Sequence, residues 1–122
     1  MANEYVVGNA YDDGRTGDGR GWFLGHFLGP EAGLRRSSAV EVKWGVHAKG
    51  YMKPKRSVLT NRYSTTLTLL VSGCFVIKFP VLASEVILQV PGDYVLFGPG
   101  VAHDAVAQEE SVVITVRWPS VP

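Results

Sequence analysis

Short apolar runs follow one another along most of the chain, with turn residues between them. They are rich in β-branched and aromatic residues, which is typical of strands. The runs predict strands at Ala39–His47, Thr65–Val71, Cys74–Phe79, Val86–Val90, Tyr94–Phe97 and Ser111–Trp118. No stretch repeats its apolar residues at the spacing of an amphipathic helix. Short, regularly spaced strands predict an all-β fold, either a sandwich or an antiparallel barrel.

Polar and apolar side chains alternate in two of these runs, so each strand has a polar face and an apolar face. Lys43 and His47 share the polar face of the first strand, and Thr115 and Arg117 share that of the last strand. In a flat sheet such a face would meet water. In a small barrel it can line a ligand cavity instead, because barrel interiors of this kind are only partly apolar.

The length and composition fit one domain over residues 1–122. The chain is 46% hydrophobic and 19% charged, which is ordinary for a globular protein with one core. Residues 1–21 are rich in glycine, aspartate and arginine and predict an irregular N-terminal arm. The apolar segment Gly21–Gly29, with the sequence GWFLGHFLG, predicts a further strand.

The charges and the single cysteine exclude several classes of function. A net charge of +1 creates no field for nucleic acid, and the aromatic residues are not interleaved with basic ones on any strand. No apolar run reaches the roughly 18 residues that span a bilayer, and the start of the chain lacks a signal-peptide pattern. Cys74 lies in an apolar run, which places it in the core. We therefore expect a cytoplasmic protein without a nucleic-acid or membrane partner.

The stretch Val42–Ser84 contains no Asp or Glu. Its basic residues are Lys43, Lys49, Lys53, Lys55, Arg56, Arg62 and Lys78. One interpretation is a solvated surface whose charges are balanced by neighbours in the fold. The other is a pocket or rim that attracts an anionic small molecule. The sequence leaves both interpretations open.

The segment Pro91–His103, with the sequence PGDYVLFGPGVAH, resembles the second conserved motif of the cupin superfamily. The glycine and histidine positions of that motif are occupied by Gly92, Gly100 and His103. Pro99 lies one place after the expected proline, and Ala107 replaces the final asparagine. The resemblance covers roughly Val40–Trp118. It implies an antiparallel cupin-type β-barrel, that is, a double-stranded β-helix or jelly roll, with His103 directed into its mouth.

The first cupin motif, which normally supplies three metal ligands, has lost them here. It reads His-x-His, then Glu, ahead of a closing glycine, and Gly73 looks like that glycine. Counting back from Gly73 places Thr66 at the glutamate position. The two histidine positions fall on other residues in either possible register: Thr60 and Arg62, or Arg56 and Val58. Only His103 matches a ligand position, so we predict no strong metal site.

The resemblance leads to three classes of function. Metal-free members of the superfamily include sugar-nucleotide epimerases and isomerases, and by this analogy His103 is the candidate catalytic base. The candidate binding residues for an anionic or sugar-like ligand are His47, Arg56, Arg62 and Arg117. A second class is a metal-dependent oxygenase or isomerase, with His103 as a metal ligand and with His47 and Asp104 in an atypical arrangement. A third class is a non-catalytic sensor or assembly module.

Structural roles compete with these functional ones. His103 can be a remnant of ancestry that is hydrogen-bonded inside the barrel, and Arg117 can form a salt bridge at the surface or in a dimer. His26 lies in an apolar run, where a structural role is expected. The apolar segment GWFLGHF is more than a small barrel covers, so we predict a homodimer.

Overall fold

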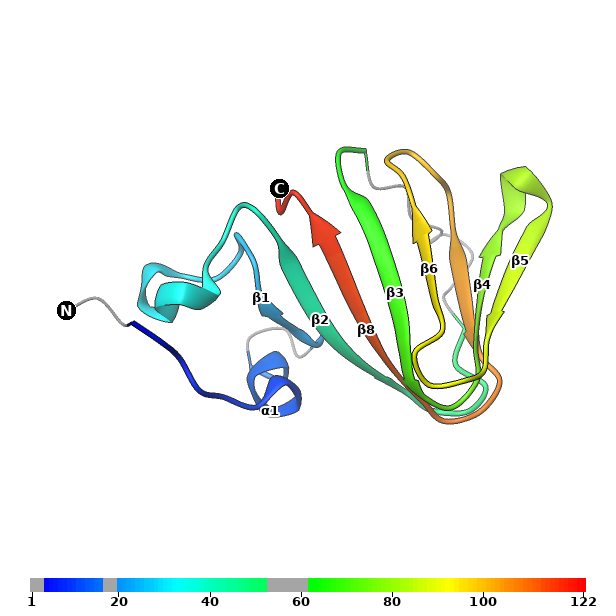
Figure 1. Ribbon diagram of the computed structural model, residues 1–122, viewed down its shortest axis with the longest axis horizontal. Helices are drawn as coiled ribbons and strands as arrows, with labels where there is room; N and C mark the ends of the chain where they lie inside the picture. Colours follow the sequence, from blue (N-terminus) through cyan, green and yellow to red (C-terminus); the bar gives the residue numbers. More distant parts are fainter. Residues whose placement is uncertain (1–3, 17–19, 53–61) are drawn as a thin grey trace.

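A computed structural model describes residues 4–16, 20–52 and 62–122 and shows two antiparallel sheets that face each other (Figure 1). The larger sheet contains, in spatial order, β1 (Trp22–Leu24), β2 (Glu41–His47), β8 (Ser111–Trp118), β3 (Thr65–Ser72) and β6 (Tyr94–Phe97). The smaller sheet contains β5 (Ser84–Leu88), β4 (Phe75–Phe79) and β7 (Asp104–Ala107). The predicted all-β antiparallel fold is confirmed.

The two sheets do not close into a continuous barrel. They meet at one end and diverge toward the other, where the C-terminus lies (Figure 1). The sequence missed β7, because its residues, DAVA, include only one β-branched residue and no aromatic one and so have little strand propensity. It also placed β5 two residues too late. Most of β5 is exposed at the sheet edge, so burial imposes no clear pattern on it.

The N-terminal arm is more regular than we predicted. It contains a short helix, α1 (Ala10–Gly14), and the Asn9 side chain accepts a hydrogen bond from the backbone N–H of Asp12 at 3.1 Å. The predicted strand over residues 21–29 is reduced to β1, because the chain turns away at Gly25, whose N–H donates to the Arg35 carbonyl. Among the described residues there are also two 3-10 helices, η1 (Pro30–Arg35) and η3 (Pro80–Leu82). In the described ranges no helix has the length and apolar character to cross a membrane.

The apolar core lies between the two sheets. Its buried members are Leu70, Phe75, Ile77, Phe79, Leu88, Phe97, Ala105, Ala107 and Val113. Cys74 is buried beside them, as the sequence predicts. The larger sheet contributes few of these residues, because threonines and charged side chains occupy many of its inward positions. The space between the sheets is therefore apolar toward the smaller sheet and polar toward the larger one.

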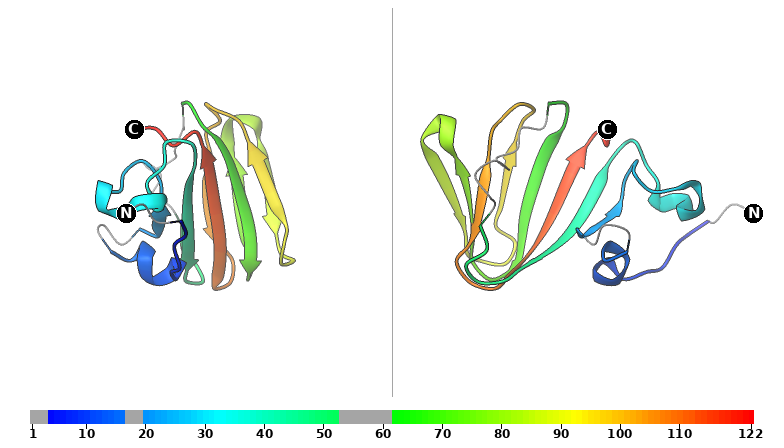
Figure 2. Two further views of the ribbon diagram at one scale, coloured as in Figure 1. Left: turned by 60° about the vertical axis from the view of Figure 1, so that its left-hand side comes forward. Right: turned by 180° about the vertical axis from the view of Figure 1, so that it is seen from behind.

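The outer face of the larger sheet is apolar over four strands. The register aligns two rows of cross-strand neighbours: Val42, Val116, Leu67 and Leu96 in one, and Trp44, Ile114, Leu69 and Tyr94 in the other. Leu96 and Tyr94 keep 50% and 59% of their surface exposed. In the described part of the chain, no other element lies in front of the outer face of β8, β3 and β6 (Figure 2, left).

Candidate functional site

A cavity opens between the two sheets. Its volume is about 500 Å³, which includes the solvent at its open mouth. Its lining combines threonines, aromatic rings, two histidines and two cations: Lys43, His47, Tyr51, Thr66, Thr68, Phe75, Ile77, Phe97, His103, Ala105, Val113, Thr115 and Arg117. No aspartate or glutamate belongs to this lining among the residues that the structure describes.

Strand alternation explains how the polar wall arises. Lys43 and Thr115 are cross-strand partners, and so are Thr66 and Arg117. Because alternate residues of a strand point to the same face, these side chains all enter the space between the sheets. The polar face of the first and last predicted strands therefore lines an open cavity between the sheets.

His103 lies at the start of β7 and is buried, with 4% of its surface exposed. Its Nδ1 atom is 3.1 Å from the Val101 carbonyl oxygen. A carbonyl oxygen can only accept, so Nδ1 carries the proton of the neutral ring in this contact. Nε2 is then the basic nitrogen. The ring also packs against Phe97, with the ring centroids 4.6 Å apart.

His47 lies at the other end of the polar wall, between two aromatic rings. Its ring centroid is 5.1 Å from that of Phe75, in a stacked arrangement, and 4.5 Å from that of Tyr51. This end of the cavity is therefore lined by packed aromatic rings.

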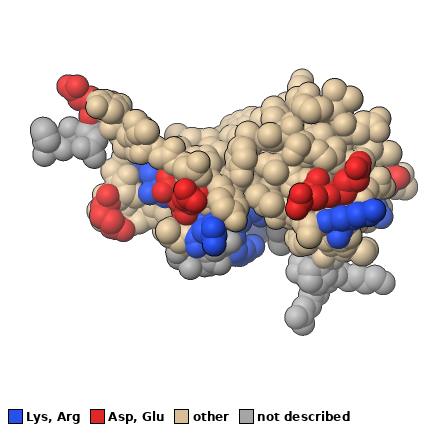
Figure 3. All heavy atoms as spheres, turned by 90° about the horizontal axis from the view of Figure 1, so that it is seen from below, with Lys and Arg blue, Asp and Glu red and all other residues tan. Residues whose placement is uncertain are grey.

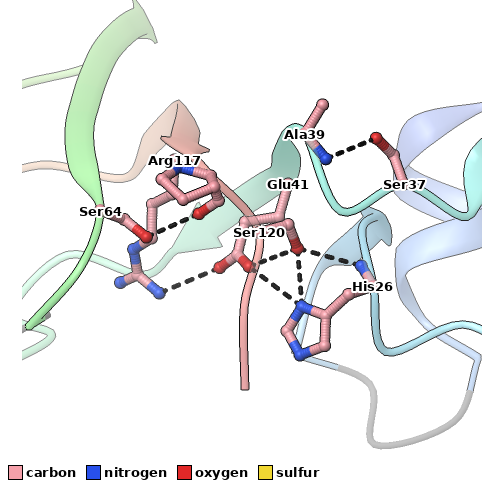
Figure 4. A network of polar contacts seen from close by, with 8 residues as sticks. His26, Ser37, Ala39, Glu41, Ser64, Arg117 and Ser120 are labelled. Carbon is pink, nitrogen blue, oxygen red and sulfur yellow. Dashed lines mark hydrogen bonds and ion pairs between the residues drawn. The ribbon is translucent and has the colours of Figure 1, made fainter.

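Arg117 is held by Glu41 behind the cavity wall. Its Nη1 atom lies 3.4 Å from Glu41 Oε2, and Ser120 Oγ donates to Glu41 Oε1 at 2.8 Å. Glu41 thus lies between the guanidinium group and the C-terminal segment (Figure 4). Burial lowers the pKa of Arg117 from its ordinary value, and the charge of Glu41 opposes that shift. The indole ring of Trp22 covers the same guanidinium group, with 4.9 Å between Cζ and the ring centroid.

The other histidine, His26, belongs to this network and does not line the cavity. Its Nδ1 atom lies 2.7 Å from Ser120 Oγ, and its backbone N–H donates to the same oxygen at 3.0 Å. Ser120 is buried, with 1% of its surface exposed, so this oxygen ties the C-terminal segment to the turn after β1 (Figure 4). The contacts are those of a structural connection between two segments.

The structure brings together three of the five predicted site residues. His47, His103 and Arg117 line the same cavity. Arg62 is exposed, and its guanidinium group lies over the Tyr63 ring at 5.8 Å, away from the lining. Arg56 lies outside the described residues. Asp104 follows His103, and its side chain accepts a hydrogen bond from the Ala105 N–H at 2.7 Å.

Several lining residues were not predicted. Lys43 has the largest consequence, because it adds a second cation to the polar wall. The other polar lining residues that were not predicted are Tyr51, Thr66, Thr68 and Thr115. Alternation was a usable signal for Lys43 and Thr115, which share a face with the predicted residues. No comparable signal marks Tyr51, which follows the end of β2.

Some basic residues of the stretch Val42–Ser84 fit a ligand pocket and others fit a solvated surface. Lys43 lines the cavity, whereas Lys49 and Lys78 are exposed. Viewed from below, the surface shows Lys and Arg in small groups beside Asp and Glu (Figure 3). Lys53 and Lys55 lie outside the described residues.

The side chains of the cavity do not fit the metal centre that the cupin fold implies. Such a centre needs three or four nitrogen or oxygen ligands around one ion. In the part of the chain that the structure describes, no three His, Cys, Asp or Glu residues are grouped closely enough to hold an ion. Thr66, which aligns with the glutamate ligand of the motif, carries a hydroxyl group that is a poor replacement for a carboxylate. The described residues of the cavity therefore do not provide the ligand set of such a metal centre.

No protein-family model matches the sequence, and no curated protein matches it either. Solved structures do resemble the fold. KdgF from a Halomonas species matches with a TM-score of 0.60 at 20% identity, over 70% of this chain and 73% of that one. A cupin superfamily protein from Desulfitobacterium hafniense matches with a TM-score of 0.57 at 18% identity, over 70% and 72%.

A cupin protein described as RmlC-like, from Desulfovibrio desulfuricans, also matches this fold. The TM-score is 0.59 at 13% identity, over 70% of this chain and 77% of that one. The likeness to these structures supports the fold that the motif at Pro91–His103 implies. The chain therefore has the cupin fold, with its sheets not fully closed and without the usual metal-ligand set among its described residues.

Proposed function

We propose that this protein binds a small anionic or polyhydroxylated molecule in the cavity between its sheets. One observation carries the proposal: the described lining contains the cations Lys43 and Arg117 and no carboxylate. Cations in a cavity with low-dielectric walls concentrate anions by focusing the field between the walls. Guanidinium also binds carboxylate and phosphate groups through two parallel hydrogen bonds.

The rest of the lining supports a ligand with hydroxyl groups and an apolar face. Three threonines and Tyr51 offer hydroxyl groups, which both donate and accept hydrogen bonds. Phe75 and His47 add aromatic rings at one end of the cavity. A few convergent polar groups on an otherwise apolar wall are typical of small-molecule sites.

His103 is the candidate base if the bound molecule is also transformed. Its Nε2 atom is the basic nitrogen when Nδ1 donates to the Val101 carbonyl group. A neutral imidazole nitrogen can accept a proton from a substrate as a general base. A sensor would use the same histidine only as a hydrogen-bonding group.

We also propose that the protein is a homodimer that associates through the outer face of its larger sheet. The apolar rows on that face run across β2, β8, β3 and β6, and their side chains carry no charge. Contiguous apolar surface of this kind marks an interface on a protein outside a membrane. A second copy presents the same apolar rows, and two such faces can pack about a twofold axis. This differs from the sequence-based prediction, in which the segment GWFLGHF forms the dimer interface.

A thermal-shift screen tests the ligand proposal. The panel contains sugar phosphates, nucleotide sugars and small organic acids, with neutral sugars and apolar compounds for comparison. An anion that binds the folded state raises the melting temperature with increasing concentration. The shift should be lost in His103→Ala and reduced in Lys43→Gln, but should be kept in Lys49→Gln, which removes an exposed lysine of the same stretch. Shifts from apolar compounds alone would show that the ligand class is wrong.

A further inference from the structure

Two buried donors on neighbouring strands have no hydrogen-bond partner. They are Thr66 Oγ1 on β3 and Arg117 Nε on β8. Neither atom meets an acceptor in the part of the chain that the structure describes. A buried donor without a partner is unfavourable, because it has lost its hydrogen bonds to water, so such atoms are rare in folded proteins.

The two donors belong to one place in the cavity. Thr66 and Arg117 are directly opposed in the ladder between β3 and β8, and both line the cavity. Thr66 has 1% of its surface exposed. A single χ1 step moves its hydroxyl group to the position of the methyl group or of the Hβ atom, so rotation can turn the hydroxyl group toward a molecule in the cavity.

Glu41 fixes the guanidinium group without using this edge. It engages Nη1, on the side toward β2, and its own second oxygen is occupied by Ser120 Oγ. The Trp22 ring covers the guanidinium face. These contacts orient the Nε edge of Arg117 while leaving its N–H group to another acceptor.

We propose that Thr66 and Arg117 form a carboxylate subsite, in which one ligand oxygen accepts from Arg117 Nε–H and the other from the Thr66 hydroxyl group. This inference rests on the proposed function and names the head group of its ligand. A monoanion fits better than a phosphate dianion, because Glu41 already compensates part of the arginine charge. The second negative charge of a phosphate would then lose its water at this pair without a positive charge to compensate it.

Matched probes on one carbon skeleton test the head group. Gluconate carries a carboxylate, glucose 6-phosphate carries a phosphate dianion, and glucose carries no charge. Binding is followed by thermal shift and by tryptophan fluorescence. Trp22 contacts the Arg117 guanidinium, whereas Trp44 and Trp118 point to the outer face of the sheet. The fluorescence change should therefore disappear in Trp22→Phe. Gluconate should bind and glucose should not, and tighter binding of glucose 6-phosphate would overturn the carboxylate assignment.

The variant Thr66→Val separates a ligand-binding hydroxyl group from a structural one. It removes the hydroxyl group at nearly constant volume, so gluconate binding should weaken about tenfold. The unliganded variant should melt no lower than the wild type, because the lost hydroxyl group has no partner there. Thr65→Val makes the same change on the opposite face of β3 and should bind like the wild type. An unliganded Thr66→Val protein that melts several degrees lower would show a structural role and contradict the subsite.

The variant Arg117→Lys keeps the charge next to Glu41 but removes the Nε donor, and it should also weaken gluconate binding about tenfold. If anions still bind to Thr66→Val and Arg117→Lys but not to His103→Ala, the subsite is wrong and the proposed function stands. If no anion of the wider screen binds the wild type, the proposed function itself fails.

Discussion

Arg117 and Glu41 are opposed in the ladder between β8 and β2, and their side chains meet inside the fold with 3.4 Å between Nη1 and Oε2. The side chains are 17% and 9% exposed, so both charges are largely removed from water. Each charge therefore depends on the other for compensation. The pair links the wall of the cavity to the network of His26 and Ser120 (Figure 4).

Replacing Glu41 should destabilise the protein more than an exposed carboxylate would. Glu41→Ala leaves the Arg117 charge largely buried without its partner, which costs about 3 kcal/mol in the free energy of unfolding. Glu110→Ala, at an exposed turn, should change it by less than about 0.5 kcal/mol. Urea unfolding followed by circular dichroism measures both values. Equal effects of the two substitutions would show that the pair is not the compensated charge we describe.

Two glycines with nearly the same backbone angle should respond differently to alanine. Gly73 has φ +97° and Gly92 has φ +98°. A Cβ atom at Gly73 would meet the Glu110 carbonyl oxygen, whereas one at Gly92 would meet nothing within 4 Å. Gly92→Ala should cost about 1 kcal/mol from backbone strain. Gly73→Ala should cost about 3 kcal/mol because the steric overlap is added. Chemical denaturation of the two variants checks the difference, and equal losses would contradict it.

Asp93 should contribute to stability above acidic pH. The backbone N–H groups of Val90 and Gln89 donate to its Oδ2 atom and lower the pKa of this carboxyl group in the folded state. The folded state therefore binds the proton more weakly than the unfolded chain, whose aspartate pKa is about 3.9. The contribution is present above that pH and is lost as the pH falls through the folded-state pKa. Thermal melts of Asp93→Asn should differ from the wild type at pH 7 and converge with it at low pH. A difference that is constant with pH would argue against this linkage.

A charge on the outer face of the larger sheet should break the proposed dimer. Leu96→Glu places a carboxylate in the apolar row on β6, and the resulting protein should sediment as a monomer. The wild type should sediment at about 27 kDa, twice the 13.3 kDa of one chain. Ile87→Glu is the control, because Ile87 is similarly exposed but lies on β5 in the other sheet. A monomeric wild type, or a dimer that survives Leu96→Glu, would exclude this interface.

The purified protein should hold little divalent metal. His47 and His103 supply two imidazole groups, which is fewer than the three or four ligands of a stable site. Elemental analysis after dialysis against a weak chelator should find far less than one equivalent of zinc, manganese, iron or nickel. Near-stoichiometric metal that disappears in His103→Ala would instead support a metal-dependent enzyme.

The local pattern of the sequence was enough to predict the fold class. Strand alternation and turn residues depend on neighbours in the chain, so β2, β3, β4, β6 and β8 were predicted close to their observed bounds. The elements that were not predicted lack such a local signal. β7 has the sequence DAVA, with only one β-branched residue, and α1 owes its first turn to the Asn9 cap and not to an apolar stripe.

The sequence by itself determined the strands, the turn that precedes His103 and the loss of the metal ligands, because each of these depends on residues close together in the chain. Only the tertiary structure decided which charges share one site. It places Lys43 and Arg117 in the lining of one cavity and Thr66 beside Arg117. Arg62 stays at the surface. Strand order and register bring together Thr66 and Arg117, which are 51 positions apart in the sequence. Alternation shows which face a residue occupies but not which strand lies next to it.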